Sequence, residues 1–419
     1  MASVIKAGNA TNGIQITSDS TGILEIKTGT GAGTTAITVG TDQAVTFAAG
    51  TTVSSLTTSG AVSAGSLTVN SNNISAVNSL GFRNRIINGD MRIDQRNAGA
   101  SVTPADNAYT LDRWQSRLSQ ASKYSVQQSS TAPSGFNNSL LVTSLSAYTV
   151  GASEFFQVRQ IIEGFNIADL GFGTASAKTI TLSFWVRSSL TGTFGGVLSN
   201  SDGSRVYVFS YSISVADTWE QKTVTITGDT TGTWGTTTGG GFVVAWSLGA
   251  GASVSGSAGS WGSTLFRGVT SGTSVVGTNG ATFYITGVQL EAGSVATPFE
   301  RRDYGRELMM CQRYYCQYGD GAKAYQHVGN GIWYSSGLGR VHVQYPVPMR
   351  TQPSISYSAL SDFNLLPGGV PTSISLNTDV ATNISVGLNV EIASSTAGTS
   401  YQMLGNNSTA MRLRFSAEL

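Results

Sequence analysis

The chain is 419 residues long, and only 11% of its residues are charged, against roughly 25% in an average soluble domain. Its 24 Lys and Arg balance 23 Asp and Glu, and a net charge of +1 provides no field that would attract nucleic acid or an anionic membrane. With 51 Gly, 8 Pro and 40% hydrophobic residues, the composition argues against a mainly helical fold. It favours short strands and tight turns, arranged in two to four domains.

The start of the chain and its apolar runs bear on its location. The opening sequence MASVIKAGNATNG lacks the long apolar stretch of a signal peptide. Apolar runs such as Phe242–Trp246 are far shorter than the roughly 20 residues that span a bilayer. Two cysteines are too few for a disulfide scaffold. We therefore expect a soluble chain without membrane insertion and without an export signal.

Residues 1–80 differ in composition from everything that follows. They contain five charged side chains, and Phe47 is their single aromatic residue. Short β-type runs recur at intervals of roughly 8–12 residues and are separated by Gly, Thr, Ser or Asn. These runs span residues 14–16, 23–26, 37–39, 45–47, 53–56 and 67–69. The spacing predicts a series of small strands.

This N-terminal region cannot bury enough apolar area by itself to offset the ordering of about 80 residues. Three chains wound about one axis would supply the missing apolar partners. The period-two pairs of β-branched residues therefore favour an intertwined trimeric shaft or anchor. A flexible linker and an independent domain remain as alternatives.

The composition changes near residue 81, where GFRNRIINGDMRIDQRNAG gathers four arginines and two aspartates. Aromatic residues become frequent beyond this point. Strands with alternating or apolar character are predicted at residues 140–145, 179–187, 206–215, 223–227, 242–248 and 283–290. Roughly 200 residues of this pattern predict one β-sandwich over residues 81–302.

Residues 303–318, DYGRELMMCQRYYCQY, are the one good helix candidate in the sequence. Its apolar residues are spaced by four, three and four positions, so they form one stripe along the helix. They are Tyr304, Leu308, Cys311 and Tyr315. A single helix of this length is marginal in water. The stripe must therefore pack on a neighbouring β domain or on symmetry-related chains.

Residues 319–419 return to the strand pattern and predict a second, smaller β-sandwich. The strands are expected at residues 331–334, 340–345, 354–360, 386–392 and 411–417. Pro346 and Pro348 are expected to end a strand, because proline cannot donate to a central ladder.

No set of residues assembles a convincing catalytic, cofactor or metal site. The only two histidines, His327 and His342, have no GxSxG-type nucleophile turn to act with, so we expect exposed polar side chains. Cys311 and Cys316 lie five residues apart in the predicted helix and are expected to be buried thiols without a disulfide. The glycines of residues 29–33 lack the Lys-Ser/Thr of a phosphate loop.

Glycosidic cleavage would require two carboxyl groups about 5–10 Å apart. Glu291 with Glu300, and Asp90 with Asp94, are possible pairs in the sequence. Among 23 acidic residues some such pair is expected by chance. We therefore expect no enzyme activity.

Aromatic residues in the C-terminal region are candidates for glycan binding, because a flat ring can stack on the apolar C–H face of a sugar. The candidates are Trp333, Tyr334 and Tyr345, with Tyr325 and Tyr357 nearby. The alternative is that these rings pack in a core or at an interface, as Trp and Tyr in β-sandwiches commonly do.

Three segments together resemble bacteriophage tail-fibre and related virion adhesin chains. NRIINGDM at residues 84–91 is followed by YTLDRW at 109–114. VQLEAGSVATPFERR at 288–302 leads into the predicted helix, and VPMRTQP at 347–353 precedes the last strands. The resemblance covers residues 83–353 and depends on the order and separation of these strings as well as on the strings themselves.

The resemblance implies a carbohydrate-binding-module-like jelly roll whose first and last strands lie side by side. Residues 88–90 would open this domain and residues 288–291 would close it. Similar modules often hold a structural calcium on these strands, and Asp90 and Glu291 are the matching residues. A single Asp–Glu pair, however, supplies too few oxygens for the usual six to eight ligands.

For function, the resemblance implies a tail-fibre protein, a structural component of the virion that is made in the host cytoplasm. The expected assembly is a homotrimer that binds other tail proteins through residues 1–80 and meets the host through a tip at residues 319–419. The expected receptor is a surface glycan or protein, and no cofactor is expected. The alternatives are a capsid (head) fibre and a polysaccharide-depolymerising tailspike, although the long β-helix usual for a tailspike is absent from the sequence.

Overall fold

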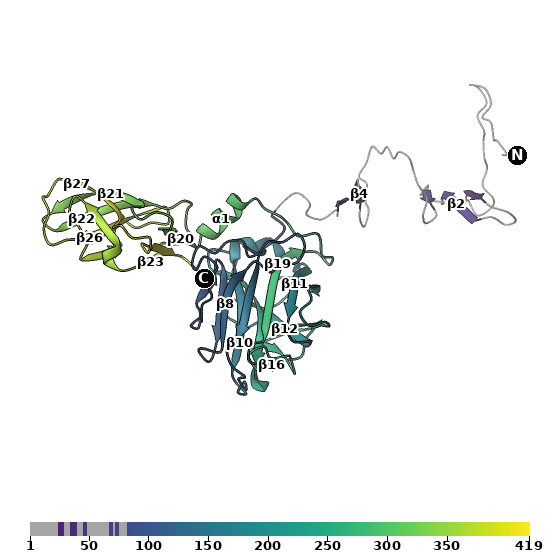
Figure 1. Cartoon of the computed structure of the whole chain (residues 1–419). Helices are drawn as coiled ribbons and strands as arrows, with labels where there is room; N and C mark the ends of the chain where they lie inside the picture. Colours follow the sequence, from purple (N-terminus) through teal and green to yellow (C-terminus); the bar gives the residue numbers. More distant parts are fainter. Residues whose placement is uncertain (1–23, 29–33, 40–44, 48–66, 70–71, 75–81) are drawn as a thin grey trace, which may run out of the picture. The chain divides into compact units, whose positions relative to one another are not determined.

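A computed structural model describes residues 24–28, 34–39, 45–47, 67–69, 72–74 and 82–419 (Figure 1). The chain divides into two compact units, residues 1–76 and 77–419. The described strands of the first unit are β1 (Leu24–Thr28), β2 (Thr34–Val39), β3 (Val45–Phe47), β4 (Leu67–Val69) and β5 (Asn72–Ile74). β1, β2 and β3 form one antiparallel sheet, and β4 pairs with β5.

These strands agree with four of the six runs predicted in the N-terminal region. The runs at 14–16 and 53–56 lie outside the described residues. The intertwined shaft itself concerns several chains and stays a prediction.

The second unit begins with two antiparallel sheets that face each other across one core. The order of the seven-stranded sheet is β17 (Trp261–Gly262), β13 (Val206–Ile213), β12 (Gly192–Asn200), β15 (Gly240–Ala250), β10 (Phe155–Glu163), β7 (Trp114–Leu118) and β6 (Tyr109–Leu111). The order of the five-stranded sheet is β14 (Glu220–Ile226), β11 (Ile180–Ser188), β19 (Thr282–Ala292), β9 (Ser139–Ser144) and β8 (Tyr124–Ser129). The central jelly-roll sandwich predicted from the sequence is confirmed.

All six strands predicted for this domain are present, as β9, β11, β13, β14, β15 and β19. The strands that the sequence did not reveal include β10 and β12. In β12 every residue from Phe194 to Asn200 is buried, so its two faces do not alternate between apolar and polar side chains. β15 is also covered on both faces, but its continuous apolar run predicts a strand, whereas Gly195, Gly196 and Ser199 interrupt the apolar residues of β12.

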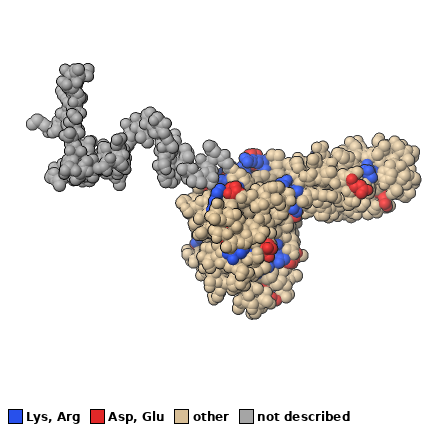
Figure 2. Space-filling model, turned by 180° about the vertical axis from the view of Figure 1, so that it is seen from behind, with Lys and Arg blue, Asp and Glu red and all other residues tan. Residues whose placement is uncertain are grey.

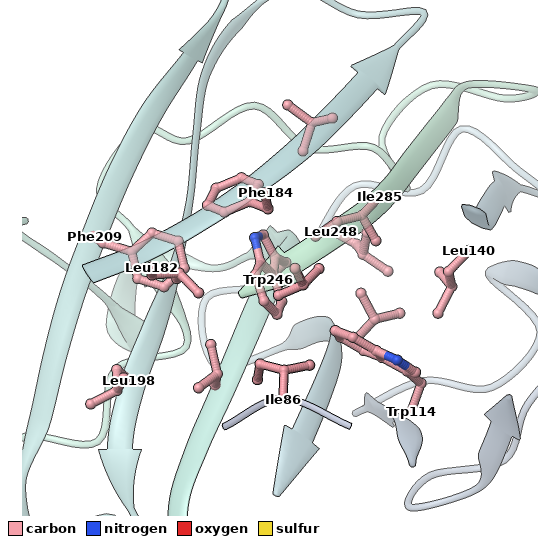
Figure 3. Close-up of a cluster of buried hydrophobic side chains, with 14 of the residues drawn as sticks. Ile86, Trp114, Leu140, Leu182, Phe184, Leu198, Phe209, Trp246, Leu248 and Ile285 are labelled. Atoms are coloured by element: carbon pink, nitrogen blue, oxygen red, sulfur yellow. The ribbon is translucent and has the colours of Figure 1, made fainter. Parts of the chain in front are cut away.

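The core of the central sandwich is built from alternate residues of facing strands (Figure 3). On β11 the inward positions are fully buried, and they are Ile180, Leu182, Phe184 and Val186. Trp246 of the opposite sheet meets the Phe184 ring edge-on, with ring centroids 5.4 Å apart. Trp114 lies 5.7 Å from the same Trp246 ring. Each such buried side chain contributes about 1.5–3 kcal/mol relative to an exposed one.

The start of the central domain lies beside its last strand, as the resemblance implies. The Arg85 amide donates to the carbonyl of Leu290 at 2.9 Å, and the Val288 amide donates to the carbonyl of Gly89 at 2.9 Å. A Cβ at position 89 would lie 2.2 Å from the Val288 carbonyl oxygen, so this close approach requires glycine. The opening segment is irregular rather than a strand.

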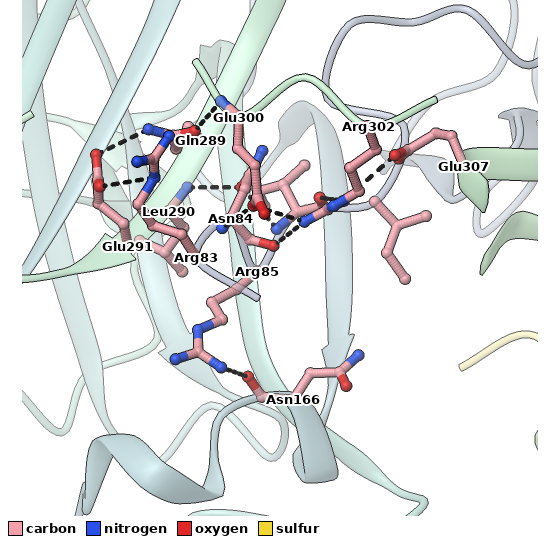
Figure 4. A network of polar contacts seen from close by, with 12 residues as sticks. Arg83, Asn84, Arg85, Asn166, Gln289, Leu290, Glu291, Glu300, Arg302 and Glu307 are labelled. Carbon is pink, nitrogen blue, oxygen red and sulfur yellow. Dashed lines mark hydrogen bonds and ion pairs between the residues drawn. The ribbon is translucent and has the colours of Figure 1, made fainter. Parts of the chain in front are cut away.

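A buried polar network joins the opening and closing segments (Figure 4). The Arg302 guanidinium donates to the Asn84 carbonyl and to the carboxylates of Glu300 (3.2 Å) and Glu307 (3.3 Å). Glu300 also accepts from the Asn84 amide at 2.6 Å and donates its own amide to the Gln289 side chain at 2.7 Å. The first two segments of the resemblance therefore meet in one network that closes the sandwich.

The single α-helix of the described residues, α1 (Tyr304–Gln312), is shorter than the predicted 303–318. The Asp303 side chain caps it by accepting from the Arg306 amide at 2.9 Å. The chain then turns into β20 (Tyr315–Tyr318), whose aromatic residues suit a strand. In the described part of the chain, no helix is long and apolar enough to cross a membrane.

The predicted apolar stripe is correct only in part. Cys311 is buried, Leu308 is half-buried and Tyr304 is 57% exposed, while Tyr315 belongs to β20. The other buried residue of the helix is Glu307, whose carboxylate accepts from the Asn88 amide. The buried face thus carries an ion-paired carboxylate, which a search for apolar periodicity cannot find.

The remaining strands form a second, smaller sandwich around a separate core, as predicted. Its three-stranded sheet has the order β20, β28 (Leu413–Ser416) and β23 (Ser354–Tyr357). Its six-stranded sheet has the order β24 (Phe363–Leu366), β27 (Ser400–Gly405), β21 (His327–Ser335), β22 (Leu338–Gln344), β26 (Ser385–Glu391) and β25 (Ser373–Leu376). β22 ends at Gln344, just before the prolines that were expected to end a strand.

Candidate functional site

The three aromatic candidates for glycan binding lie in different environments. Trp333 is only 2% exposed and stacks on Tyr401, with ring centroids 4.2 Å apart, inside the core of the second sandwich. Tyr345 is 4% exposed and packs on Phe415. In the alternation of buried and exposed residues, both Trp333 and Tyr345 occupy buried positions that face the core. Neither ring is therefore accessible to a ligand. Tyr334 is 51% exposed and is the one of the three that solvent reaches.

The other polar and aromatic candidates of this domain divide in the same way. Tyr325 is exposed, whereas Tyr357 is half-buried beside Phe363. His327 and His342 are both exposed, as the sequence predicts. An imidazole nitrogen of His327 lies 3.2 Å from the side-chain oxygen of Asn330.

A groove of about 440 Å³ lies on the outer face of the six-stranded sheet. We call it the sheet groove, and its lining residues are Asn330, Gly331, Ile332, Arg340, His342, Val380 and Gly387. The strand register places these residues side by side, because Asn330 pairs with His342 and His342 pairs with Gly387. Arg340 pairs with Ile332 in the next row.

A glycine keeps the floor of the sheet groove open. A Cβ at position 387 would lie 2.8 Å from a methyl carbon of Val380 and 3.0 Å from Cδ of Arg340. With no side chain at Gly387, the space between these two neighbours stays empty. A larger residue would have to push Val380 or Arg340 aside.

The lining combines hydrogen-bonding groups with apolar surface. Asn330, Arg340 and His342 offer donors and acceptors, while Ile332 is exposed as an apolar wall. The Arg340 guanidinium lies 5.7 Å from the ring centroid of Tyr334, so the exposed ring borders this row of the sheet. A sugar carries hydroxyl groups around an apolar C–H face and matches such a mixed lining.

Charge on the surface is sparse. On the face of the molecule that Figure 2 shows, acidic and basic side chains of residues 82–419 are scattered among uncharged ones. A neutral, hydrogen-bonding surface suits an uncharged polyhydroxylated ligand better than it suits a polyanion.

The carboxylate pair Glu291 and Glu300 lies in the buried polar network that joins the opening and closing segments of the central domain, which we call the closing network. Glu291 accepts from the Thr297 amide (2.9 Å), the Thr297 hydroxyl (2.6 Å) and the Gln289 amide group (2.9 Å). Its carboxylate also lies 3.6 Å from the guanidinium of Arg83. These carboxylates are engaged with protein donors and are structural.

Asp90 and Asp94 are likewise engaged. Asp90 forms an ion pair with Arg92 at 2.5 Å, and burial raises its pKa. Asp94 accepts from the backbone amides of residues 97 (3.0 Å) and 99 (2.7 Å) and so holds a turn. Among the described residues, no group of three His, Cys, Asp or Glu side chains is placed to hold a metal ion. Because Asp90 and Glu291 each face an arginine, this donor set does not fit the calcium site that the resemblance implies.

The two cysteines lie on different elements, which corrects the expectation that both belong to the helix. Cys311 is in α1 and Cys316 is in β20, and both are free and buried. Burial raises the pKa of Cys316 to about 12 and that of Cys311 well above its usual value. Neither thiol is activated as a nucleophile.

The sequence interpretation missed most of the groove. Its residues Asn330 and Ile332 alternate along β21 with the neighbouring Tyr334, and Arg340 and His342 alternate along β22. This period-two pattern was visible and would have placed them on one outward face. The pairing of these strands with β26, which brings in Gly387, required the structure.

Comparisons with known proteins concern the architecture. No protein-family model and no curated protein matches the chain. Among solved structures, the enzymatically active domain of bacteriophage CBA120 tailspike protein 4 matches at 11% identity and a TM-score of 0.27, covering 50% of this chain and 21% of that one. A carbohydrate-binding module of family 4 matches at 16% identity and a TM-score of 0.26, covering 49% of this chain and 98% of that module.

A further match is TmCBM61, solved in complex with β-1,4-galactotriose, at 11% identity and a TM-score of 0.26. It covers 51% of this chain and 100% of that module. At these identities and TM-scores, no function passes from these proteins to this chain.

Proposed function

We propose that this chain is a bacteriophage tail-fibre protein, a structural virion component that recognises a glycan on the host surface. The sheet groove is the recognition site in this proposal. Residues 1–80 attach the fibre to other tail proteins, and three copies of the chain assemble into one fibre.

The single observation that carries the proposal is the sheet groove, which lies on a β surface with few charged side chains. Its floor is open at Gly387, and its walls offer Asn330, Arg340 and His342 beside the apolar Ile332. The groove is accessible without any rearrangement of the core beneath it, because Trp333 and its neighbours fill that core from the other face of the sheet.

The sequence resemblance supports the virion assignment. Its first two segments, residues 84–91 and 288–302, meet in the network that closes the jelly roll.

We also propose that the chain binds its glycan without cleaving it. The candidate carboxylates Glu291 and Glu300 are held by protein donors in the closing network. Incubation of the bound glycan with the chain should leave its length unchanged by mass spectrometry. Shortened products would instead favour the depolymerising tailspike.

The proposal is tested by applying the full chain to an array of bacterial surface glycans. We expect selective binding that falls at least about tenfold in His342→Ala and in Arg340→Gln, since each removes a polar contact worth about 1.4 kcal/mol or more. Gln344→Ala is the matched control, because Gln344 lies on the same strand and the same exposed face but outside the groove. Equal losses in all three variants, or no selective binding, would overturn the proposal.

Two further measurements address assembly and location. The mass of the particle in solution should be three times the 43.6 kDa of the chain. Antibody labelling of virions should decorate the tail, and labelling of the head would favour the capsid-fibre alternative.

A further inference from the structure

A second polar cluster lies on the central sandwich, on the outer face of the seven-stranded sheet. β7 and β10 are neighbours there, with Gln115 opposite Arg159 and Arg117 opposite Gln157. Because side chains alternate along a strand, all four project from the face opposite the core. The Arg159 Nε donates to the Gln115 side-chain oxygen at 2.6 Å, which fixes the arginine over the sheet.

A loop adds a third arginine to this face. The Arg267 guanidinium lies 4.6 Å from the Phe155 ring centroid, and the Arg117 guanidinium lies 5.5 Å from the same ring. The Gln157 amide group donates to the Arg267 carbonyl at 2.7 Å and so holds the loop against the sheet. We call Arg117, Arg159 and Arg267 the arginine cluster.

Within residues 82–419 the positive charge of the arginine cluster is balanced only in part. Arg117 pairs with Asp106 at 2.7 Å, but within residues 82–419 neither Arg159 nor Arg267 forms an ion pair. Burial and then the neighbouring Arg117 lower the pKa of Arg159 to about 10 and lower the pKa of Arg267. The surroundings of Arg159 and Arg267 therefore disfavour the charged form of these two side chains, and a bound anion would stabilise it.

The floor of the cluster contains an unused hydrogen-bond acceptor. Gln157 is fully buried, and in the described part of the chain its side-chain oxygen has no donor. A buried acceptor without a donor costs about 1–3 kcal/mol. A hydroxyl group on a bound molecule is a suitable donor, whereas an inorganic anion such as phosphate offers few donors at neutral pH.

We propose that the arginine cluster binds the carboxylate of an acidic saccharide, with sugar hydroxyls bonding to the glutamine side chains beneath it. A guanidinium matches a carboxylate through paired N–H donors. This inference deepens the proposed function, since it names the class of glycan that one face of the fibre accepts. It concerns residues separate from the sheet groove, so each site can fail without the other.

The test is calorimetric titration of the full chain with three carboxylate-bearing oligosaccharides, namely tetragalacturonate, a hyaluronan tetrasaccharide and sialyllactose. At least one should bind at least about tenfold more tightly than its neutral methyl ester, because esterification removes a charge-assisted contact. Arg159→Gln and Arg267→Gln should each weaken that binding about tenfold. The control Arg187→Gln, a partly exposed arginine on the five-stranded sheet, should leave it unchanged.

Measurements of the melting temperature distinguish a ligand-binding role of Arg159 and Arg267 from a structural role. Arg159→Gln should keep or raise the melting temperature, because the folded state holds this charge in an unfavourable place. The acidic oligosaccharide should raise the melting temperature of the original chain but not that of the double variant of Arg159 and Arg267.

Three results would overturn the proposal. The first is failure of all three acidic oligosaccharides to bind, and the second is equal affinity for acid and ester. The third is binding of polyphosphate or single-stranded DNA as tightly as the best saccharide, which would indicate general attraction of anions. Unchanged glycan-array binding in the cluster variants, together with loss in His342→Ala, would leave the sheet groove as the only site.

Discussion

The two sandwiches of residues 82–419 differ in where they place polar side chains. The central sandwich buries many charged groups, among them Asp112, Arg113, Glu163 and Glu291. In residues 319–419 few polar or charged side chains are buried, and Asn377 and Glu418 are among them. The smaller domain instead presents Arg340 and His342, which are exposed on the outer face of the six-stranded sheet.

This difference teaches how each domain uses its few charges. In the central sandwich the charged side chains form internal contacts that hold the two sheets together. Others join the sandwich to the last residues of the chain, and Glu418, for example, pairs with Arg96 at 2.7 Å. The smaller domain packs around an apolar core and keeps Arg340 and His342 exposed on the outer face of its larger sheet. Stability should therefore depend on different chemistry in the two regions.

The largest effect is expected in the apolar core of the smaller domain. Trp333→Ala should lower the free energy of unfolding by about 4 kcal/mol, because it removes a buried ring and leaves a cavity beside Tyr401. Tyr334→Ala, on the exposed side of the same strand, should change it by no more than about 0.5 kcal/mol. Urea unfolding measures both. A stable Trp333→Ala that has lost glycan binding would place this ring in the site after all.

The closing network of the central domain should be the next most sensitive feature. Arg302→Ala leaves Glu300 and Glu307 without their cation and should cost about 3 kcal/mol, the lower end of the range for breaking a buried pair, because Arg302 keeps 7% exposure. Arg306→Ala, exposed on α1, is the control. If the melting temperatures of the two variants agree, the network does not hold the sandwich closed.

A pH dependence should distinguish the central domain. Burial raises the pKa of Asp112 from 3.8 to about 6, although Gln95 donates to it. The folded state therefore binds this proton more tightly than the unfolded state, so the contribution to stability is present below about pH 4 and lost as pH rises through 6. At about 1.4 kcal/mol per pKa unit, this amounts to a loss on the order of 3 kcal/mol.

Asp112→Asn removes that titration. The stability of the original chain relative to this variant should fall between pH 4 and pH 7, as measured by urea unfolding at several pH values. A constant difference across this range would mean that Asp112 is not held in a buried site.

The smallest expected signal is the reaction of the two thiols. Cys311 packs with Ile87 and Ile93 next to the central domain, and Cys316 lies in the core of the smaller one. Neither should be alkylated under native conditions over hours, because burial raises both pKa values. Peptide mass spectrometry measures the alkylation of Cys311 and of Cys316 separately, and so shows which of the two regions opens. Rapid labelling of Cys316 alone would show that the smaller domain opens locally.

The sequence predicted strands that show either alternating exposure or a continuous apolar run, and β15 is an example of such a run. β22, with strictly alternating exposure, was found, and so was β11, whose inward residues alternate. β12 was missed because Gly195, Gly196 and Ser199 interrupt its apolar residues, which leaves neither an alternating pattern nor an apolar run. The helix was placed correctly at its start but extended too far, because the aromatic residues after Gln312 fit either a helical stripe or a strand.

The candidate site was predictable only in its location. The smaller domain was chosen for its exposed turns and its aromatic residues, and the groove lies there. Trp333 and Tyr345 were chosen by residue type, although alternation with Tyr334 along β21 implied that Trp333 points inward. The arginine cluster was not identified, because its residues come from β7, β10 and a distant loop.

The most direct test of the central claim is hydrogen–deuterium exchange of the full chain with and without a glycan selected from the array. The account predicts slower exchange in β21, β22 and β26, which form the sheet groove, and unchanged exchange in β20, β23 and β28. Protection confined to residues 82–302, or absent from the groove strands, would contradict it.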